Sequence, residues 1–178
     1  MKEIEVKAKV KDKELILSKL KEMNIELQDP ITQKDIVFIP KQFEGKPPLG
    51  TNVLRIRDQD GKLTFTLKQP QKNELDCIEK EIPLDNAQQM HDIIIMLGFK
   101  VYAEFSKTRR KAKYNGLEIC LDEVSGLGSF IEVERLAEEG DAEKIQEELF
   151  AFLMKLGVSK EDQVMKGYDT LVYLKNNG

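Results

Sequence analysis

The stretch Glu3-Ile4-Glu5-Val6-Lys7 alternates charged with aliphatic residues, and Ala8-Lys9-Val10 continues the alternation. Successive side chains of a strand point to opposite faces, so the pattern predicts a strand with its charges on one face and its aliphatic side chains on the other. Neighbouring positions on one face lie roughly 7 Å apart, where two like charges raise each other's pKa unless a cation lies between them. The segment suggests a metal site, although taken alone it fits a solvated edge strand better, since most charge runs are solvated.

The same period-two alternation returns later in the chain, with both signs of charge. It predicts further strands over residues 32–39, 53–57, 62–68, 77–82, 99–114, 117–124 and 130–136. Asp58-Gln59-Asp60-Gly61 and Asn115-Gly116 are hairpin-turn sequences, so the strands on either side of each are expected to pair antiparallel. The pattern therefore indicates an antiparallel sheet with one charged face and one apolar face.

Three segments carry the apolar periodicity of amphipathic helices: residues 12–24, 85–98 and 141–157. Residues 168–174 are amphipathic but fit a helix or a strand, and residues 41–51, rich in glycine and proline, are interpreted as an active-site flap. If the sheet closes into a barrel, its charged face lines the lumen and the helices cover its apolar outside. The sequence thus predicts an α+β fold.

Composition sets the broad class of protein. The chain has 178 residues, 40% of them hydrophobic and 34% charged, which is typical of a folded protein and most simply of a single domain. A net charge of −4 argues against bulk nucleic-acid binding. The charged start and the absence of a long apolar run predict a cytoplasmic protein that does not enter a membrane. Cys77 and Cys120 lack paired spacing and are expected to be reduced thiols.

A charged lumen has chemical consequences. Arginines and lysines on several strands, with carboxylate pairs on others, would be costly to bury unless water, a metal and a polyanion occupied the space between them. A triphosphate with a divalent cation fits this description. Carboxylates without histidine or paired cysteine favour a hard ion, Mg²⁺ or Mn²⁺.

Six segments in this order resemble the motifs of the CYTH proteins, also called triphosphate tunnel metalloenzymes. They are Glu3-x-Glu5-x-Lys7, Leu54-Arg55-Ile56-Arg57, Thr66-Leu67-Lys68, Glu79-x-Glu81, Lys107-x-Arg109, and the run from Leu121-Asp122-Glu123-Val124 through Gly126-Leu127-Gly128 to Phe130-x-Glu132-x-Glu134. The resemblance covers nearly the whole chain and implies one CYTH domain over residues 1–178. It also implies a closed eight-stranded antiparallel β-barrel, with a charged lumen that forms a triphosphate tunnel and helices packed outside.

The resemblance assigns a role to each matching residue. The implied metal group is Glu3, Glu5, Asp122, Glu132 and Glu134, with Glu81 as a further or outer member. The implied triphosphate-binding residues are Lys7, Arg55, Arg57, Lys68, Lys107 and Arg109, of which Lys7, Arg57 and Lys68 are expected to be catalytic. Lys9, Lys111, Lys113 and Glu118 extend the same faces toward or beyond the tunnel mouth. Tyr168 matches the family's C-terminal tyrosine motif, with Gly167 where a serine is expected.

The resemblance leaves three functions open. The first is a class IV adenylyl cyclase, in which the 3′-hydroxyl of ATP attacks the α-phosphorus and pyrophosphate leaves. The second is a triphosphatase, in which water attacks the terminal phosphorus of inorganic triphosphate, thiamine triphosphate or a nucleotide. The third is a metal-dependent sensor of polyphosphate or nucleotide without turnover, against which the intact carboxylate set argues. The family also implies a homodimer. Of the three functions, the sequence favours the cyclase.

Overall fold

A computed structural model describes residues 2–137 and 141–178, and its strands carry the alternating segments. The strands are β1 (Lys2–Lys9), β2 (Ile31–Pro40), β3 (Val53–Gln59), β4 (Lys62–Pro70), β5 (Asp76–Leu84), β6 (Phe99–Tyr114), β7 (Leu117–Val124), β8 (Gly128–Ala137) and β9 (Gln163–Val164). The helices are α1 (Lys13–Glu22), α2 (Ala87–Met96), α3 (Ala142–Lys155), the 3₁₀ turn η1 (Lys160–Asp162) and α4 (Tyr168–Asn177).

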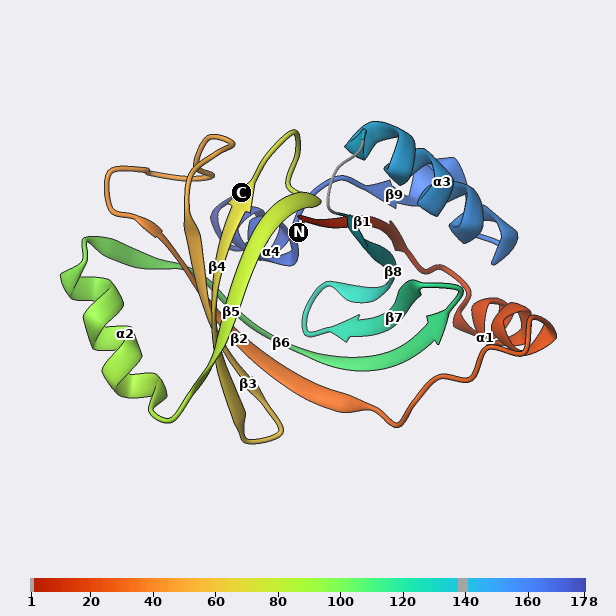
Figure 1. Ribbon diagram of the computed structural model, residues 1–178, viewed down its shortest axis with the longest axis horizontal. Coiled ribbons are helices and arrows are strands. Elements are labelled where there is room, and N and C mark those ends of the chain that lie inside the picture. The colour runs from red at the N-terminus through yellow and green to blue at the C-terminus, as the bar shows by residue number, and fades with distance from the viewer. Residues whose placement is uncertain (1, 138–140) are drawn as a thin grey trace.

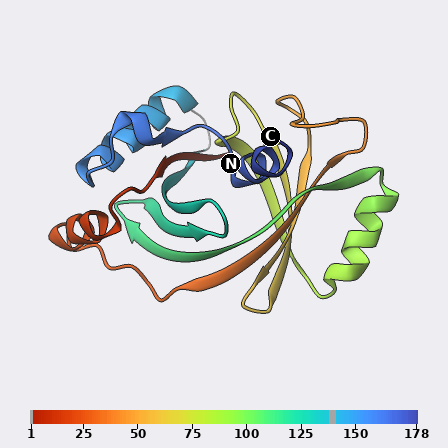
Figure 2. The same ribbon diagram turned by 180° about the vertical axis from the view of Figure 1, so that it is seen from behind.

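Strands β1 to β8 form a closed antiparallel barrel, as predicted. The sheet runs β5-β4-β3-β2-β6-β7-β8-β1, and β1 also pairs with β5, so that the sheet has no free edge there. This closing pairing is short and joins Lys2–Ile4 to Asp76–Ile78. In Figures 1 and 2 the long paired strands β2 and β6 run together across the lower part of the molecule.

Two hairpin turns take the conformation that their sequences predicted. Asp60 and Asn115 have φ of 49°, and the glycine after each, Gly61 and Gly116, has φ of 86° and 77°. Two successive residues with positive φ are the requirement of a type I′ turn, whose twist matches that of the flanking strands. These turns fix the registers of β3 with β4 and of β6 with β7.

Helices α1, α2 and α3 lie against the outward apolar face of the barrel. Residues of α1 and α3, such as Leu20 and Leu153, share a core with Val6 of β1 and Val133 of β8. Around Ile94, α2 packs on β2 and β3 in a separate core. The N-cap of α1 is Asp12 and that of α2 is Asn86, and each side chain accepts a hydrogen bond from a backbone N–H of its helix. Among the described residues, no helix has the length and apolar character needed to cross a bilayer.

The segment 168–174, which fitted either a helix or a strand, belongs to helix α4. Its Val172 packs with Val37 of β2 and Tyr102 of β6, and its Tyr168 packs with Phe130 of β8. Figures 1 and 2 show α4 between the two halves of the barrel. Because the first turn of α4 also lines the internal cavity described below, the helix covers part of the tunnel.

Candidate active site in the barrel lumen

The charged face of the sheet lines a cavity of about 330 Å³ inside the barrel. The charged residues that the strands contribute to its wall are Glu3, Glu5, Lys7, Asp35, Arg55, Arg57, Lys68, Glu79, Glu81, Lys107, Arg109, Lys111, Glu132 and Glu134. Every site residue expected from the sequence lines this cavity except Asp122. The shared strand parity therefore brings residues from seven strands to one place.

Three carboxylates form a cluster at this wall. Oxygen atoms of Glu3, Glu5 and Glu134 lie within 4.8 Å of one another. Burial, followed by the charge of Glu132, raises the pKa of Glu5 to about 7. Burial, followed by the charges of Glu3 and Glu5, raises the pKa of Glu134 to about 9. The cluster is thus short of positive charge.

This cluster suits a divalent metal ion. Carboxylate oxygens are the ligands that Mg²⁺ and Mn²⁺ prefer, and a cation among them would relieve the repulsion that raises their pKa values. Glu3, Glu5 and Glu134 are accordingly the residues that would hold the ion expected in a triphosphate tunnel metalloenzyme.

Glu132 lies on the same face but has a different environment. Its Oε1 accepts from Lys7 Nζ at 3.1 Å, and its Oε2 accepts from Arg109. Burial acts to raise the pKa of Glu132, but Lys7 and Arg109 outweigh it and hold the pKa well below the usual range. Glu132 is therefore an ionised partner of two cations in this structure.

Asp122 lies behind the cations instead of on the cavity wall. Arg109 Nε donates to its Oδ1 at 2.7 Å, and Lys107 Nζ donates to its Oδ2 at 3.1 Å. The carboxylate is fully buried. In this position Asp122 holds Arg109 and Lys107 in place, apart from the cluster of Glu3, Glu5 and Glu134.

Arg57 is fixed by Asp35, a site residue that the sequence did not assign. Arg57 donates from Nε and Nη2 to the two oxygens of Asp35, both at 2.7 Å. Burial acts to raise the pKa of Asp35, but the hydrogen bonds and charge of Arg57 lower it to about 2. The two residues are cross-strand neighbours in β2 and β3, so register was the information needed to find this pair.

Arg55 and Lys68 have carboxylate partners on β5. Arg55 Nη2 lies 3.4 Å from Glu81 Oε2, which also accepts from the Thr66 hydroxyl at 2.8 Å. Lys68 Nζ lies 2.5 Å from Glu79 Oε1. Glu81 therefore contacts the arginine wall, and Glu79, which shares its face, is a further acidic residue of the lumen.

Tyr168 lies beneath two of the cations. The Nζ atoms of Lys7 and Lys107 stand 4.1 Å and 4.7 Å from the centre of its ring, which is a cation–π arrangement. Burial, followed by the charge of Arg109, lowers the pKa of Lys107 to about 8. The tyrosine expected from the C-terminal motif thus contacts one lysine of β1 and one lysine of β6.

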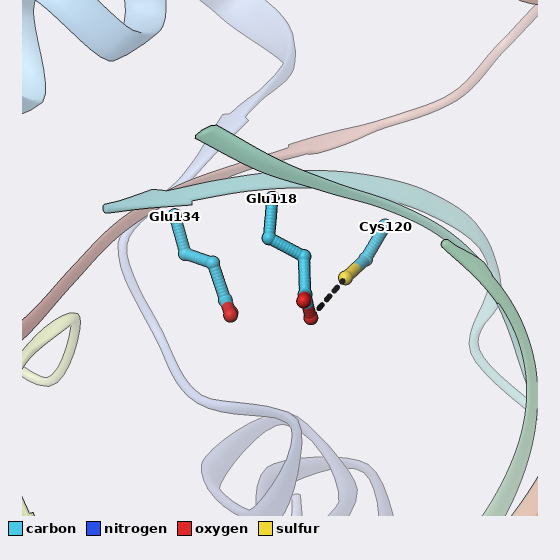
Figure 3. Close-up of side chains that lie close together, drawn as sticks. All are labelled: Glu118, Cys120 and Glu134. Atoms are coloured by element: carbon cyan, nitrogen blue, oxygen red, sulfur yellow. Dashed lines mark hydrogen bonds between the residues drawn. The ribbon is translucent and has the colours of Figure 1, made fainter. Parts of the chain in front are cut away.

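A second group of possible ligands adjoins the cluster and is shown in Figure 3. Cys120 Sγ donates to Glu118 Oε1 at 3.8 Å, and Glu134 stands beside them. Glu118 already pairs with Lys111, and burial raises the pKa of the Cys120 thiol far above neutrality. A protonated thiol is a poor ligand for a hard cation, so this group suits Mg²⁺ or Mn²⁺ less well than the carboxylate cluster.

The other lysines that were expected on the charged strand faces differ in their exposure to solvent. Lys111 lines the cavity, whereas Lys9 and Lys113 are exposed to solvent. Cys77 lines the cavity as a free thiol. The flap contributes Lys46, Pro47, Pro48 and Leu49 to the cavity wall, which agrees with its interpretation as part of the site.

A closed barrel with a carboxylate cluster and a cationic wall in its lumen defines a class of barrel proteins with a charged tunnel. Within this class, the CYTH domain matches residues 1–168, so the chain belongs to the CYTH family. The resemblance drawn from the six motifs is confirmed.

Individual relatives are similar over most of their length. A Methanocaldococcus jannaschii protein named "Putative adenylate cyclase" is 31% identical over 171 residues, which are 93% of this chain and 95% of the relative. A solved structure of a conserved hypothetical protein from Pyrococcus furiosus has a TM-score of 0.80 at 26% identity and covers 96% of this chain and 99% of its own.

A more distant structure shares the fold alone. It is a Hippeastrum protein named as a "putative adenylyl cyclase" with a dominant triphosphatase activity. Its TM-score is 0.62 at 18% identity, with 99% of this chain and 96% of that chain covered.

Proposed function

We propose that the protein is a class IV adenylyl cyclase, a divalent-metal-dependent enzyme that binds ATP in the barrel lumen and releases cyclic AMP and pyrophosphate. The observation that carries the proposal is the placement of a carboxylate cluster and a wall of arginines and lysines around one cavity. The name of the Methanocaldococcus jannaschii relative supports the choice of reaction.

The cationic wall is suited to a triphosphate. Arg55 Nε is buried and has no hydrogen-bond partner within residues 2–137 and 141–178, so a phosphate oxygen would satisfy it. Arg57 is held in a fixed orientation by Asp35, which spares it the entropy of ordering when an anion binds. We assign Lys7, Arg55, Arg57, Lys68, Lys107 and Arg109 to the triphosphate.

In the proposed reaction the 3′-hydroxyl oxygen of ATP forms a bond to the α-phosphorus as its proton is released to water. The bond from that phosphorus to the bridging oxygen breaks, and its electron pair leaves with pyrophosphate. A divalent ion held by Glu3, Glu5 and Glu134 would supply charge neutralisation at the phosphate oxygens. Lys7, Arg57 and Lys68 would stabilise the charge that develops on the leaving group.

The cavity also has an apolar portion, which favours a nucleotide over inorganic triphosphate. Val37, Val53, Phe105 and Tyr102 line the cavity from β2, β3 and β6. A base would bury this surface, whereas inorganic triphosphate would leave it in contact with water.

The second candidate is a triphosphatase that keeps the same tunnel and directs water to the terminal phosphorus. This candidate is supported by the likeness in fold to the Hippeastrum protein, whose name includes a dominant triphosphatase activity. The same lumen residues would bind the substrate, and only the phosphorus attacked would differ.

The finer expectations from the sequence accompany the proposal. We propose Mg²⁺ or Mn²⁺ as the ion, one CYTH domain over residues 1–178, a cytoplasmic location, a homodimer, and no nucleic-acid or membrane partner. The fit of the carboxylate cluster to a hard cation supports the first of these.

Phosphorus NMR of the purified protein with Mg²⁺ or Mn²⁺ tests the reaction. The protein is incubated separately with ATP and with inorganic triphosphate. Pyrophosphate and cyclic AMP from ATP are the expected products. Orthophosphate from triphosphate, with ATP unchanged, would replace the cyclase by the triphosphatase, and no product from either would refute both.

A further inference from the structure

Lys46 is the one cation of the described cavity wall that a loop carries in place of a strand. It lies in the flap between β2 and β3, and its side chain is 47% exposed. By contrast, Lys7, Lys107 and Arg109 have exposures of 1%, 3% and 7% and are held by buried carboxylates. Lys46 therefore has freedom of movement that Lys7, Lys107 and Arg109 lack.

Glu74 holds Lys46 in the present conformation. Its Oε1 pairs with Lys46, while its Oε2 accepts from the backbone N–H of Gly167 at 2.8 Å. Gly167 precedes the first residue of α4, and both Glu74 and Gly167 line the cavity. One carboxylate thus joins the flap to the helix that covers part of the tunnel.

The flap is anchored on both sides of Lys46. On one side the Tyr173 hydroxyl of α4 donates to the Glu44 carbonyl at 2.7 Å. On the other, the Gly50 N–H donates to the Pro70 carbonyl at 2.7 Å, at a glycine whose φ of 82° permits the turn. Within the described part of the chain, no backbone hydrogen bond involves residues 45–47. The short segment that carries Lys46 can shift without disturbing either anchor.

From these contacts we infer that Lys46 is a further substrate-binding residue, which exchanges Glu74 for a phosphate group when a triphosphate enters the tunnel. The inference rests on the proposed function, because it concerns the same triphosphate site. Solvent reaches the half-exposed Lys46 and weakens its pairing with the single charge of Glu74, whereas a terminal phosphate carries more charge. The exchange is therefore favourable and draws the flap onto the substrate.

The first test removes the charge of Lys46. The probe is a methylene-bridged triphosphate that resists cleavage, titrated calorimetrically with Mg²⁺ into Lys46→Gln and the wild type. Loss of one charge-assisted contact is expected to raise Kd by about tenfold and to weaken its dependence on salt. Lys41→Gln is the matched control, because Lys41 is an exposed lysine at the start of the same flap and does not line the cavity.

The second test removes the competing charge. Glu74→Gln keeps an acceptor for the Gly167 N–H but releases Lys46, so the same probe is expected to bind a few-fold more tightly. A purely structural role for Glu74 would instead weaken binding. The opposite signs of the two variants are therefore diagnostic of an exchange.

The outcomes separate this inference from the proposed function. If the wild type does not bind the triphosphate probe, the proposed function fails. If the wild type binds and Lys46→Gln behaves as Lys41→Gln does, only the inference about Lys46 is overturned. Weaker binding by Glu74→Gln would also overturn the exchange, and thermal unfolding of each variant shows whether the fold is retained.

Discussion

Glu132 and Glu134 are the same residue type on the same face of the same strand, yet their environments are opposite. Glu132 lies opposite Lys7 of β1, and despite its burial, which acts to raise the pKa, Lys7 and Arg109 hold its pKa well below the usual range. Glu134 lies opposite Glu5, and burial together with Glu3 and Glu5 raises its pKa to about 9. Cross-strand neighbours thus divide one wall into a charge-compensated part and a part that lacks positive charge.

The largest effect is expected from Glu134→Gln. If the uncompensated part holds the metal, this variant loses metal-dependent turnover by about 100-fold or more, because a neutral amide is a much poorer ligand for a hard cation. The metal-free variant should also melt at a higher temperature than wild type, because the neutral amide avoids the cost of burying an ionisable carboxyl beside Glu3 and Glu5. Turnover assays and thermal unfolding without metal test both points. Full activity would move the metal away from Glu134.

Glu132→Gln should act on stability in the opposite direction. It leaves Lys7 and Arg109 buried with less compensation, so we expect it to destabilise the protein by about 3 kcal/mol. Denaturant unfolding of Glu132→Gln and Glu134→Gln, both without metal, compares the free energies of unfolding of the two variants. An unchanged midpoint for Glu132→Gln would remove the distinction between the two parts of the wall.

The pH dependence of stability sharpens the comparison further. A carboxyl whose pKa is raised by folding binds its proton more tightly in the folded state, so its contribution is present below about pH 4.5 and lost as pH rises through the folded-state pKa. With values of about 7 for Glu5 and about 9 for Glu134, the metal-free protein should lose stability between about pH 4.5 and 9. We expect the melting temperature to fall by about 5 °C more in wild type than in Glu134→Gln. Saturating Mn²⁺ should reverse this trend, and equal pH profiles with and without metal would contradict the assignment.

The smallest effect concerns Tyr168, which supports the compensated part. Tyr168→Phe keeps the ring beside Lys7 and Lys107 and should change KM for the triphosphate substrate by less than about twofold. Tyr168→Leu removes the ring's attraction for both ammonium groups and should raise KM by about tenfold. Equal KM values for the two variants would show that the ring does not position the lysines.

The period of two was sufficient to predict an antiparallel sheet with one charged face, whereas closure into a barrel was predicted from the resemblance to the CYTH family. Glu3, Glu5 and Lys7 could be placed on one face of β1 without any knowledge of which strands are its neighbours. The motif order then led to the CYTH family and to eleven of the residues that line the cavity.

What the sequence left open depends on contacts between distant segments. Asp35 had no assigned partner in the sequence until the register of β2 with β3 placed it opposite Arg57. Likewise, nothing within residues 168–174 distinguished helix from strand, because the partners of α4 come from β2, β6 and β8. The opposite pKa shifts of Glu132 and Glu134 also could not be predicted without the register of β1 with β8.

The short pairing of β1 with β5 has a consequence for how the protein folds. Strand β1 lies between β5 and β8, whose partners Asp76 and Leu136 are distant from it in sequence. Pairing strands that are this far apart in the sequence costs loop-closure entropy before the new contacts compensate for it. Folding is therefore slow. During synthesis β1 cannot pair with β8 until β8 has emerged from the ribosome, so the cluster of Glu3, Glu5 and Glu134 and the contact of Lys7 with Glu132 form only in that late step.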